Sequence, residues 1–288
     1  MKFTKMHGAG NDYVYVDCTK KELKNPEEIA RRVSDRHTGL GSDGLILIKS
    51  SQEADFEMAM YNADGTYGKM CGNGIRCVAK FVYDKGLTDK TEISVVSAGA
   101  VKHLKLYVAD GQVERVRVNM GTPILEPEKI PVLGGTKAMV GEPIDVDGQT
   151  YAMTCISMGN PHAVIFLDSV KDLDLTKLGP KFEKHERFPD RVNTEFVRVM
   201  DRKNLEMRVW ERGSGETLAC GTGACATAVA AILNGYTGRE VTVHLLGGDL
   251  KIYWDPADRS VYMTGPAATV FEGEIDLGEL EETKQKRN

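Results

Sequence analysis

The sequence has no excess of positive charge. Its 288 residues carry a formal net charge of −5, and no run of Lys and Arg is longer than two. A protein that binds a nucleic-acid backbone needs a concentrated positive field. We therefore expect no nucleic-acid partner.

Long apolar stretches are also missing. No segment approaches the roughly 20 apolar residues of a membrane-spanning helix, and residues 1–5 lead into a Gly/Asn/Asp turn without the apolar core of a secretion signal. We expect no membrane partner and a cytoplasmic protein.

The six cysteines lack the spacing of zinc or redox motifs. The nearest pairs are Cys71/Cys77 and Cys220/Cys225, and the six histidines form no HExxH or HxH cluster. A chain of this length without a secretion signal has no need of disulfides, so we expect reduced thiols and no metal site. No Lys stands in a recognisable pyridoxal phosphate context, and we expect no cofactor.

The length and the 41% apolar content favour two domains with sizeable cores. A Pro- and Gly-rich stretch from Gly121 to Pro143 has no clean period and indicates a connection between two halves. In each half the residue pattern predicts short strands and a helix near the start (26–35 and 174–186). It also predicts a Gly-rich entry into a second helix (75–83 and 221–234). In the second half, residues 144–157 and 204–211 are among the predicted strands.

One shift of 149 positions superimposes the two halves. It carries Cys71-Gly72-x-Gly74 onto Cys220-Gly221-x-Gly223, Gly10-Asn11 onto Gly159-Asn160, and the helix-stopping Gly86 onto Gly235. A single ungapped shift that aligns separated features indicates a duplicated unit. We therefore expect two pseudo-symmetric α/β (α+β) domains of similar topology with one site in the crevice between them.

Cys71 and Cys220 are the strongest candidates for chemistry. Each precedes a Gly-x-Gly segment that opens a helix, so its sulfur should lie near unpaired N–H groups and the positive end of the helix dipole, which favours a thiolate. A lone free Cys is more often a small core residue. The duplication at one offset favours an acid/base pair instead, whereas Cys77 and Cys225 lie inside the helices and read as core residues.

Further polar residues at strand ends and helix starts form an inventory suited to an amino acid. Backbone N–H groups at Gly72-Asn73 and Gly221-Thr222 can hold a carboxylate. Asparagine donates and accepts, Glu accepts from an ammonium, and Arg binds a carboxylate in bidentate fashion. The side chains concerned are Asn11, Asn62, Asn160, Asn193, Glu211 and Arg212. Local turn capping is the alternative for each Asn.

Four segments resemble the motif set of the diaminopimelate epimerase family: HGAGNDY (7–13), NADGTYGKMCGNGIRC (62–77), GNPHAV (159–164) and ERGSGETLACGTGACA (211–226). With the duplicated layout, the resemblance covers residues 1 to about 277. It implies two domains, each a mixed sheet or barrel around one central helix, with the last strand returning to the first domain. The implied boundaries are 1–120 with about 266–277, then 121–265, followed by a charged tail over 279–288 that we expect to be disordered.

The resemblance also implies an isomerase that interconverts LL- and meso-2,6-diaminopimelate in the synthesis of lysine and cell-wall precursors, acting as a homodimer. It places the catalytic pair on Cys71 and Cys220, with Cys220 deprotonating the LL substrate. It places supporting residues on His162 and Glu211. Substrate contacts fall on Asn11, Asn62, Gly72, Asn73, Asn160, Asn193, Glu211, Arg212, Gly221 and Thr222. Some family members carry a side-chain amide where this chain has Gly44.

Three alternatives remain open from the residues. Another cofactor-free racemase with two cysteines, similar to proline racemase, would need a small apolar pocket. The polar residues that argue against such a pocket are Asn62, Asn160, Asn193 and Arg212. A non-catalytic amino-acid-binding protein would need no reactive thiol pair. A thiol redox protein is disfavoured because Cys-x-x-Cys is absent.

Overall fold

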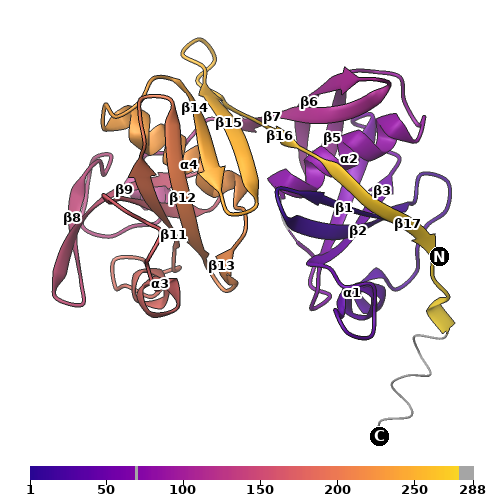
Figure 1. Ribbon diagram of the computed structural model, residues 1–288, viewed down its shortest axis with the longest axis horizontal. Coiled ribbons are helices and arrows are strands. Elements are labelled where there is room, and N and C mark those ends of the chain that lie inside the picture. Colours follow the sequence, from indigo (N-terminus) through magenta and orange to yellow (C-terminus); the bar gives the residue numbers. More distant parts are fainter. Residues whose placement is uncertain (69–70, 279–288) are drawn as a thin grey trace, which may run out of the picture. The chain divides into compact units, whose positions relative to one another are not determined.

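The computed structural model describes residues 1–68 and 71–278, which form two compact units. The first unit comprises Met1–Val118 and the returning segment from Pro266, and the second comprises Asn119–Gly265. Figure 1 colours the chain from indigo to yellow, so the returning strand stands out in yellow among the indigo and purple strands of the first unit. The tail over 279–288, for which we expected disorder, lies outside the described residues.

The first unit is a mixed sheet with two helices. Its strands pair in the order β17-β1-β2-β3-β4-β5-β6-β7, with parallel neighbours at β2/β3 and β4/β5 and antiparallel neighbours elsewhere. The bounds are β1 (Lys2–Gly8), β2 (Asn11–Asp17), α1 (Pro26–Ser34), β3 (Gly44–Lys49), β4 (Phe56–Asn62), α2 (Gly72–Asp84), β5 (Glu92–Ser97), β6 (Ala100–Ala109), β7 (Gln112–Gly121) and β17 (Ala268–Glu274).

The second unit repeats this topology. Its strands pair in the order β8-β9-β10-β11-β12-β14-β15-β16, again with two parallel neighbours, β10/β11 and β12/β14. A short β13 adds to β12. The bounds are η1 (Pro127–Lys129), β8 (Glu142–Val146), β9 (Gln149–Ser157), β10 (Pro161–Phe166), α3 (Leu175–Glu183), β11 (Asn193–Val199), β12 (Asn204–Glu211), β13 (Gly215–Thr217), α4 (Gly221–Leu233), β14 (Glu240–Leu245), β15 (Gly248–Trp254) and β16 (Val261–Pro266).

The internal repeat is thus visible in the strand order as well as in the sequence. The offset of 149 carries α1 onto α3 and α2 onto α4 residue for residue. In the first unit β17 takes the place that β8 has in the second, because each is the outer antiparallel neighbour of an equivalent strand. The predicted fold, two similar mixed α and β units, is confirmed.

The single strand predicted over 144–157 is wrong. The chain turns at Asp147 and Gly148, both with positive φ, and makes the antiparallel pair β8 and β9. Asp-Gly between two β-rich runs is a common hairpin turn, since both residues tolerate positive φ.

Each sheet covers a central helix on one face and a second helix on the other. In β3, Leu45 and Leu47 pack in the apolar cluster beneath α1, whereas Ile46 between them lies against Gly74 of α2. Alternation of side chains across a strand produces this division. Figure 1 shows α2 and α4 enclosed by the strands of their own units. The sequence of α4 is apolar or small almost throughout, as expected for a helix buried on every side.

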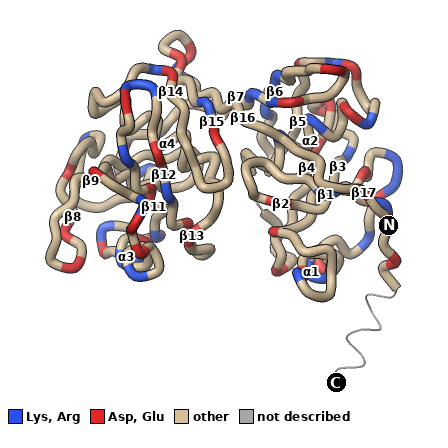
Figure 2. Tube along the Cα trace, viewed as in Figure 1, with Lys and Arg blue, Asp and Glu red and all other residues tan. Residues whose placement is uncertain are grey.

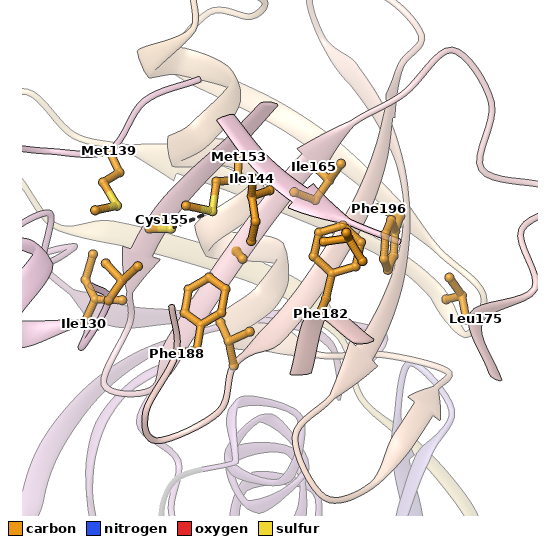
Figure 3. Packing of buried hydrophobic residues seen from close by; sticks show 14 of the residues in the cluster. Ile130, Met139, Ile144, Met153, Cys155, Ile165, Leu175, Phe182, Phe188 and Phe196 are labelled. Atoms are coloured by element: carbon orange, nitrogen blue, oxygen red, sulfur yellow. Dashed lines mark hydrogen bonds between the residues drawn. The ribbon is translucent and has the colours of Figure 1, made fainter. Parts of the chain in front are cut away.

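The core beneath α3 in the second unit is built from large side chains (Figure 3). Phe182 of α3 meets Phe196 of β11 edge to face, with ring centroids 5.4 Å apart, and Tyr151 packs on Phe182 at 5.2 Å. Such aromatic pairs contribute about 0.5–1.5 kcal/mol beyond the burial of their area. The outer helix is therefore anchored firmly to the sheet that carries the β10 and β11 site residues.

Charges of both signs are interspersed along each unit (Figure 2). Among the described residues, no helix is both long enough and apolar enough to cross a membrane.

Candidate active site

Cys71 is the N-cap of α2, the central helix of the first unit. Its backbone is extended (φ −124°, ψ 106°), and its Sγ accepts a hydrogen bond from the N–H of Gly74 at 3.2 Å. The sulfur thus occupies the position that a Ser or Asp oxygen takes in an ordinary cap. It lies at the positive end of the helix, where a thiolate is stabilised.

Asn11 is brought to Cys71 by the β1–β2 turn and is held in one orientation. Its Nδ2 donates to Asp43 at 2.8 Å, so its Oδ1 faces the sulfur of Cys71 at 3.3 Å. Asp43 is itself fixed by Arg36 at 2.9 Å and by the backbone N–H of Asp12 at 3.1 Å. This network determines which end of the Asn11 amide meets the thiol.

Arg76 places a buried cation one turn into α2. Its guanidinium donates to the carbonyl oxygens of Gly72 (3.0 Å) and Pro266 (3.1 Å) and to Oδ1 of Asn73 (2.9 Å). Burial raises the pKa of the Cys71 thiol, while the N–H of Gly74, a hydrogen bond from Tyr13 and the charge of Arg76 act to lower it. Each opposing group stabilises the thiolate.

Two further predicted residues of this unit have local partners. Asn62 donates to Thr66 Oγ1 at 3.0 Å within its own turn. The Asn73 side chain accepts a hydrogen bond from Arg76, and its backbone N–H lies at the start of the helix, beside that of Gly72.

Cys220 is the N-cap of α4 in the second unit, with nearly the same backbone as Cys71 (φ −115°, ψ 109°). Its Sγ lies 3.5 Å from Thr222 Oγ1, and its side chain is buried. Gly221 and Thr222 begin the helix. The two candidate cysteines therefore occupy equivalent positions in equivalent elements.

Two carboxylates surround the second cysteine. Burial, and then the negative charges of Glu211 and Glu195, raise the pKa of Cys220 well above its ordinary value. Burial also raises the pKa of Glu211, whose carboxylate accepts hydrogen bonds from Thr217 (2.5 Å) and from the Cys220 thiol. Each group therefore acts on the other: the hydrogen bond from Cys220 lowers the pKa of Glu211, and the charge of Glu211 raises the pKa of Cys220.

His162 connects this site to Glu195. Its Nδ1 lies 2.7 Å from Glu195 Oε1 and its Nε2 lies 3.0 Å from Asn160 Oδ1, and both His162 and Glu195 are fully buried. Among the described residues, the second oxygen of Glu195 has no hydrogen-bond partner. An incompletely satisfied buried carboxylate is expensive to maintain and is a frequent mark of a functional site.

Glu195 was missed by the sequence analysis. It stands in β11 between Thr194 and Phe196, in a strand whose residues Asn193 to Val197 are all buried. A carboxylate in a strand buried on both faces is rare unless it is paired, and that pattern could have found it.

Asn193 and Arg212 lie close together, and their side chains form hydrogen bonds with backbone groups of the protein. Asn193 donates to the carbonyl of Pro161 at 2.8 Å and accepts from the backbone N–H of Arg212 at 2.9 Å. The Arg212 guanidinium donates to the carbonyl of Asp190 at 2.8 Å. Asn193 therefore fixes the turn that carries Glu211 and Arg212.

The fold is shared with solved structures of other proteins. A probable proline racemase from Agrobacterium radiobacter K84 aligns with a TM-score of 0.69 at 14% identity, covering 96% of this chain and 93% of the other. A phenazine biosynthesis protein of the PhzF family from Bacillus anthracis aligns with a TM-score of 0.67 at 15% identity, covering 96% and 99%.

Sequence comparison is more specific. The family model described as "Diaminopimelate epimerase" matches residues 3–126 and 154–270. A diaminopimelate epimerase from Acetivibrio thermocellus is 56% identical over 280 residues, covering 97% of this chain and 100% of the relative. One from Methanococcus maripaludis strain S2 is 55% identical over 277 residues, covering 96% and 100%. The chain belongs to the diaminopimelate epimerase family, and the predicted family is confirmed.

Proposed function

We propose that this protein is a diaminopimelate epimerase, which inverts one Cα to interconvert LL- and meso-2,6-diaminopimelate, with Cys71 and Cys220 as the acid/base pair and without a cofactor. The observation that supports it best is the duplicated cap. Two thiols stand at equivalent N-caps of two equivalent central helices, with nearly identical backbone angles. If each cysteine were only a small core residue, nothing would require a cysteine at the same cap position in both units.

Inversion needs a base on one face of the Cα and an acid on the other. In the LL direction Cys220, as a thiolate, removes the α-proton, and the Cys71 thiol delivers its own proton to the opposite face of the carbanion. Cys220 then holds the substrate's proton and Cys71 is the thiolate, so the roles reverse for the return reaction. Glu211 supports Cys220 because its carboxylate already accepts the hydrogen bond of that thiol.

The α-proton of an amino acid is far less acidic than a thiol, so the developing charge must be stabilised. Backbone N–H groups at the starts of α2 and α4, from Gly72-Asn73 and Gly221-Thr222, suit the carboxylate of the substrate. Asn11, Asn62, Asn160, Glu211 and Arg212 supply polar groups for the amines and the distal carboxylate. Asn193 acts through the turn that it fixes.

Hydrogen isotopes test the two-base mechanism directly. With LL substrate in D2O, Cys220 takes the substrate's proton and Cys71, already exchanged with solvent, delivers deuterium. Mass spectrometry at under about a tenth of full conversion should find deuterium at the inverted centre of the product and little in the recovered substrate. Substantial substrate-derived hydrogen in early product would rule out two separate bases.

The rival functions separate in one assay. Chiral chromatography after incubation with LL-diaminopimelate or with L-proline should show inversion of the first and none of the second. Inversion of proline alone would favour the proline racemase-like alternative. Tight binding of diaminopimelate without inversion would favour a binding protein.

We further propose that the enzyme acts in the cytoplasm as a homodimer, in the synthesis of lysine and peptidoglycan precursors. Its substrate is a small molecule, and no nucleic acid or membrane takes part. The net charge of −5 is consistent with this proposal.

A further inference from the structure

Glu183 is the last residue of α3, and its carboxylate is buried, with 6% of the side chain exposed. The indole Nε1 of Trp210 donates a hydrogen bond to Oε2 at 2.7 Å, and the backbone N–H of Gly213 donates to Oε1 at 3.2 Å. The Arg191 guanidinium donates to Oε1 at 3.3 Å. A buried carboxylate is costly unless donors satisfy it, and here both oxygens have donors that lie outside α3.

These donors keep the Glu183 carboxylate ionised. Burial acts to raise its pKa, but the hydrogen bonds from Trp210, Gly213 and Arg191 outweigh burial, so the pKa of Glu183 lies below its ordinary value. Hydrogen bonds to an ionised group are roughly twice as strong as those between neutral groups. Glu183 therefore holds the indole and the Gly213 N–H as an anion.

Trp210 packs on the face of α3 that carries Glu183. Gly179 precedes Glu183 by one helical turn and so lies on the same side of the helix. A Cβ at Gly179 would stand only 2.2 Å from Cδ2 of Trp210, so the indole lies directly on the helix at this point. Phe182 anchors α3 in the core of the second unit. The carboxylate therefore reaches the indole from a rigid support.

The turn after β12 is held at two successive backbone N–H groups. Asn193 of β11 accepts from the N–H of Arg212 at 2.9 Å, and Glu183 of α3 accepts from the N–H of Gly213 at 3.2 Å. Gly213 has a φ of +80°, so the chain reverses here. Two side chains from two different elements thus fix the backbone from which the Arg212 side chain projects.

The internal repeat supplies an independent argument. The offset of 149 relates Glu183 to Ser34 and Arg212 to Ala63. In the first unit the hydroxyl of Ser34 accepts a hydrogen bond from Ser42 at 3.2 Å, and the N–H of Ala63 donates to a backbone carbonyl. The carboxylate at the end of the outer helix and the arginine in the turn therefore occur together, in the same copy of the repeat.

We infer that Glu183 is a positioning residue, which fixes the turn after β12 through the Gly213 N–H and the Trp210 indole and so holds Arg212 in place for a carboxylate of the substrate. The inference rests on the proposed function, in which Arg212 supplies a polar group for the distal carboxylate. Glu211, the residue before Arg212, is held separately by Thr217 and by its pairing with Gly215. Loss of Glu183 should therefore weaken substrate binding more than proton transfer.

The first test measures the turn in the full-length protein without substrate. Glu183→Gln keeps the shape of the side chain but exchanges one acceptor oxygen for an NH2 group, so it cannot accept from both Trp210 and Gly213. Hydrogen exchange in peptides that cover residues 211–215, read by mass spectrometry, should become about ten- to hundredfold faster, as expected for one lost hydrogen bond to a charged group. Unchanged exchange in a folded variant overturns the inference.

Glu186→Gln is the matched control. It makes the same chemical change at an exposed glutamate three residues further along the chain, so the exchange of the turn should not respond. If Glu183→Gln does not fold, Glu183→Asp is used in its place. That variant keeps the charge but is one methylene shorter, so it cannot reach both donors. Exchange in the turn should again be faster, and unchanged exchange would contradict the inference.

The second test separates KM from kcat on LL-diaminopimelate. Glu183→Gln should raise KM about tenfold and change kcat by less than about threefold, because the lost contact positions a group that binds substrate. In an Arg212→Ala background the same replacement should raise KM no further, since Glu183 acts through Arg212. Equal losses of kcat and KM, or an additive effect in the double variant, would assign Glu183 a general structural role.

The two tests also separate this inference from the proposed function. If the unmodified protein does not invert LL-diaminopimelate, the proposed function fails. The exchange measurement, which needs no turnover, still decides whether Glu183 holds the turn.

Discussion

The surroundings of Cys71 and Cys220 differ in charge although the backbone that carries them is the same. Cys71 faces neutral donors and the Arg76 cation, whereas Cys220 faces the carboxylates of Glu211 and Glu195. The duplication has preserved a helix-capping thiol and changed its neighbours. Since a cation favours a thiolate and a carboxylate opposes it, we expect Cys71 to ionise at lower pH than Cys220.

This difference suits a substrate whose two directions begin from different faces. Under the proposed mechanism, the free protein would favour the direction in which Cys71 removes the proton. In the LL direction of that mechanism Cys220 would first lose its proton, and the Glu211 carboxylate already accepts the hydrogen bond of that thiol. The two cysteines are therefore expected to differ in how readily each loses its proton.

The largest expected effect comes from removing either thiol. Cys71→Ala and Cys220→Ala should each lower the rate of epimerisation at least about a thousandfold, roughly 4 kcal/mol of barrier, because one missing group stops transfer between the faces. Chiral chromatography of the products measures this loss. Cys18→Ala, at a cysteine away from both caps, should keep the activity. Substantial activity in both cap variants would refute the two-thiol assignment.

Replacing a carboxylate beside Cys220 should bring the pKa values of Cys71 and Cys220 closer together. Glu211→Gln removes a negative charge that raises the pKa of Cys220, so that pKa should fall and iodoacetamide should label Cys220 about tenfold faster near neutral pH. Epimerisation should nevertheless decline, because an amide cannot take up the thiol proton as the Glu211 carboxylate can. Labelling of Cys71 serves as the internal control. Slower labelling of Cys220 would show that Glu211 does not oppose its ionisation.

Equivalent glycines allow a paired test of packing. A Cβ at Gly223 would lie 2.5 Å from Glu195 Oε1, whereas one at Gly74 would meet the Cδ1 of Ile46 at 2.7 Å. The Cδ1 methyl of Ile46 can rotate away, whereas the buried carboxylate of Glu195 is hydrogen-bonded to His162 and cannot move freely. Gly223→Ala should therefore cost about 1–3 kcal/mol of unfolding free energy in denaturant titrations, and Gly74→Ala distinctly less. Equal losses would contradict the view that the carboxylate is held rigidly.

The smallest effect is the order in which the native thiols react. As pH rises, iodoacetamide should label Cys71 before Cys220, because carboxylates raise the pKa of Cys220 further. Cys77 and Cys155, whose pKa values burial raises to about 11 and about 12, should follow only at strongly alkaline pH. Time-resolved peptide mapping gives the order. If Cys220 were labelled first, its pKa would be the lower of the two, contrary to this expectation.

The internal repeat allowed equivalent positions of the two units to be predicted from the sequence. A shift of 149 positions located both helix caps and related Asn11 to Asn160, since ungapped duplication preserves the path of the backbone. It did not reveal the charge difference, because Glu195 and Arg76 correspond to Ile46 and Cys225, and a repeat says nothing of positions where its copies diverge. Tyr13 entered the sequence analysis only within the segment HGAGNDY, although the same shift relates it to His162.

Strand ends were harder to predict than helices. The Asp147-Gly148 turn was overlooked inside an apparently continuous run, although the same dipeptide at Asp110-Gly111, also with positive φ, makes the turn between β6 and β7. β13 is only three residues long and pairs within a turn next to β12. Such short pairings depend on tertiary contacts more than on local pattern.

The returning strand β17 has a consequence for how the chain folds as it is synthesised. The second unit has all its strands once Pro266 has been made, whereas the first unit still needs residues 268–274 to pair with β1. Until then the outer edge of β1 is an open template for other strands, the kind of edge on which chains aggregate. The unit translated first is therefore completed last, and a chain that stops before β17 would release a folded second unit tethered to an unfinished first one.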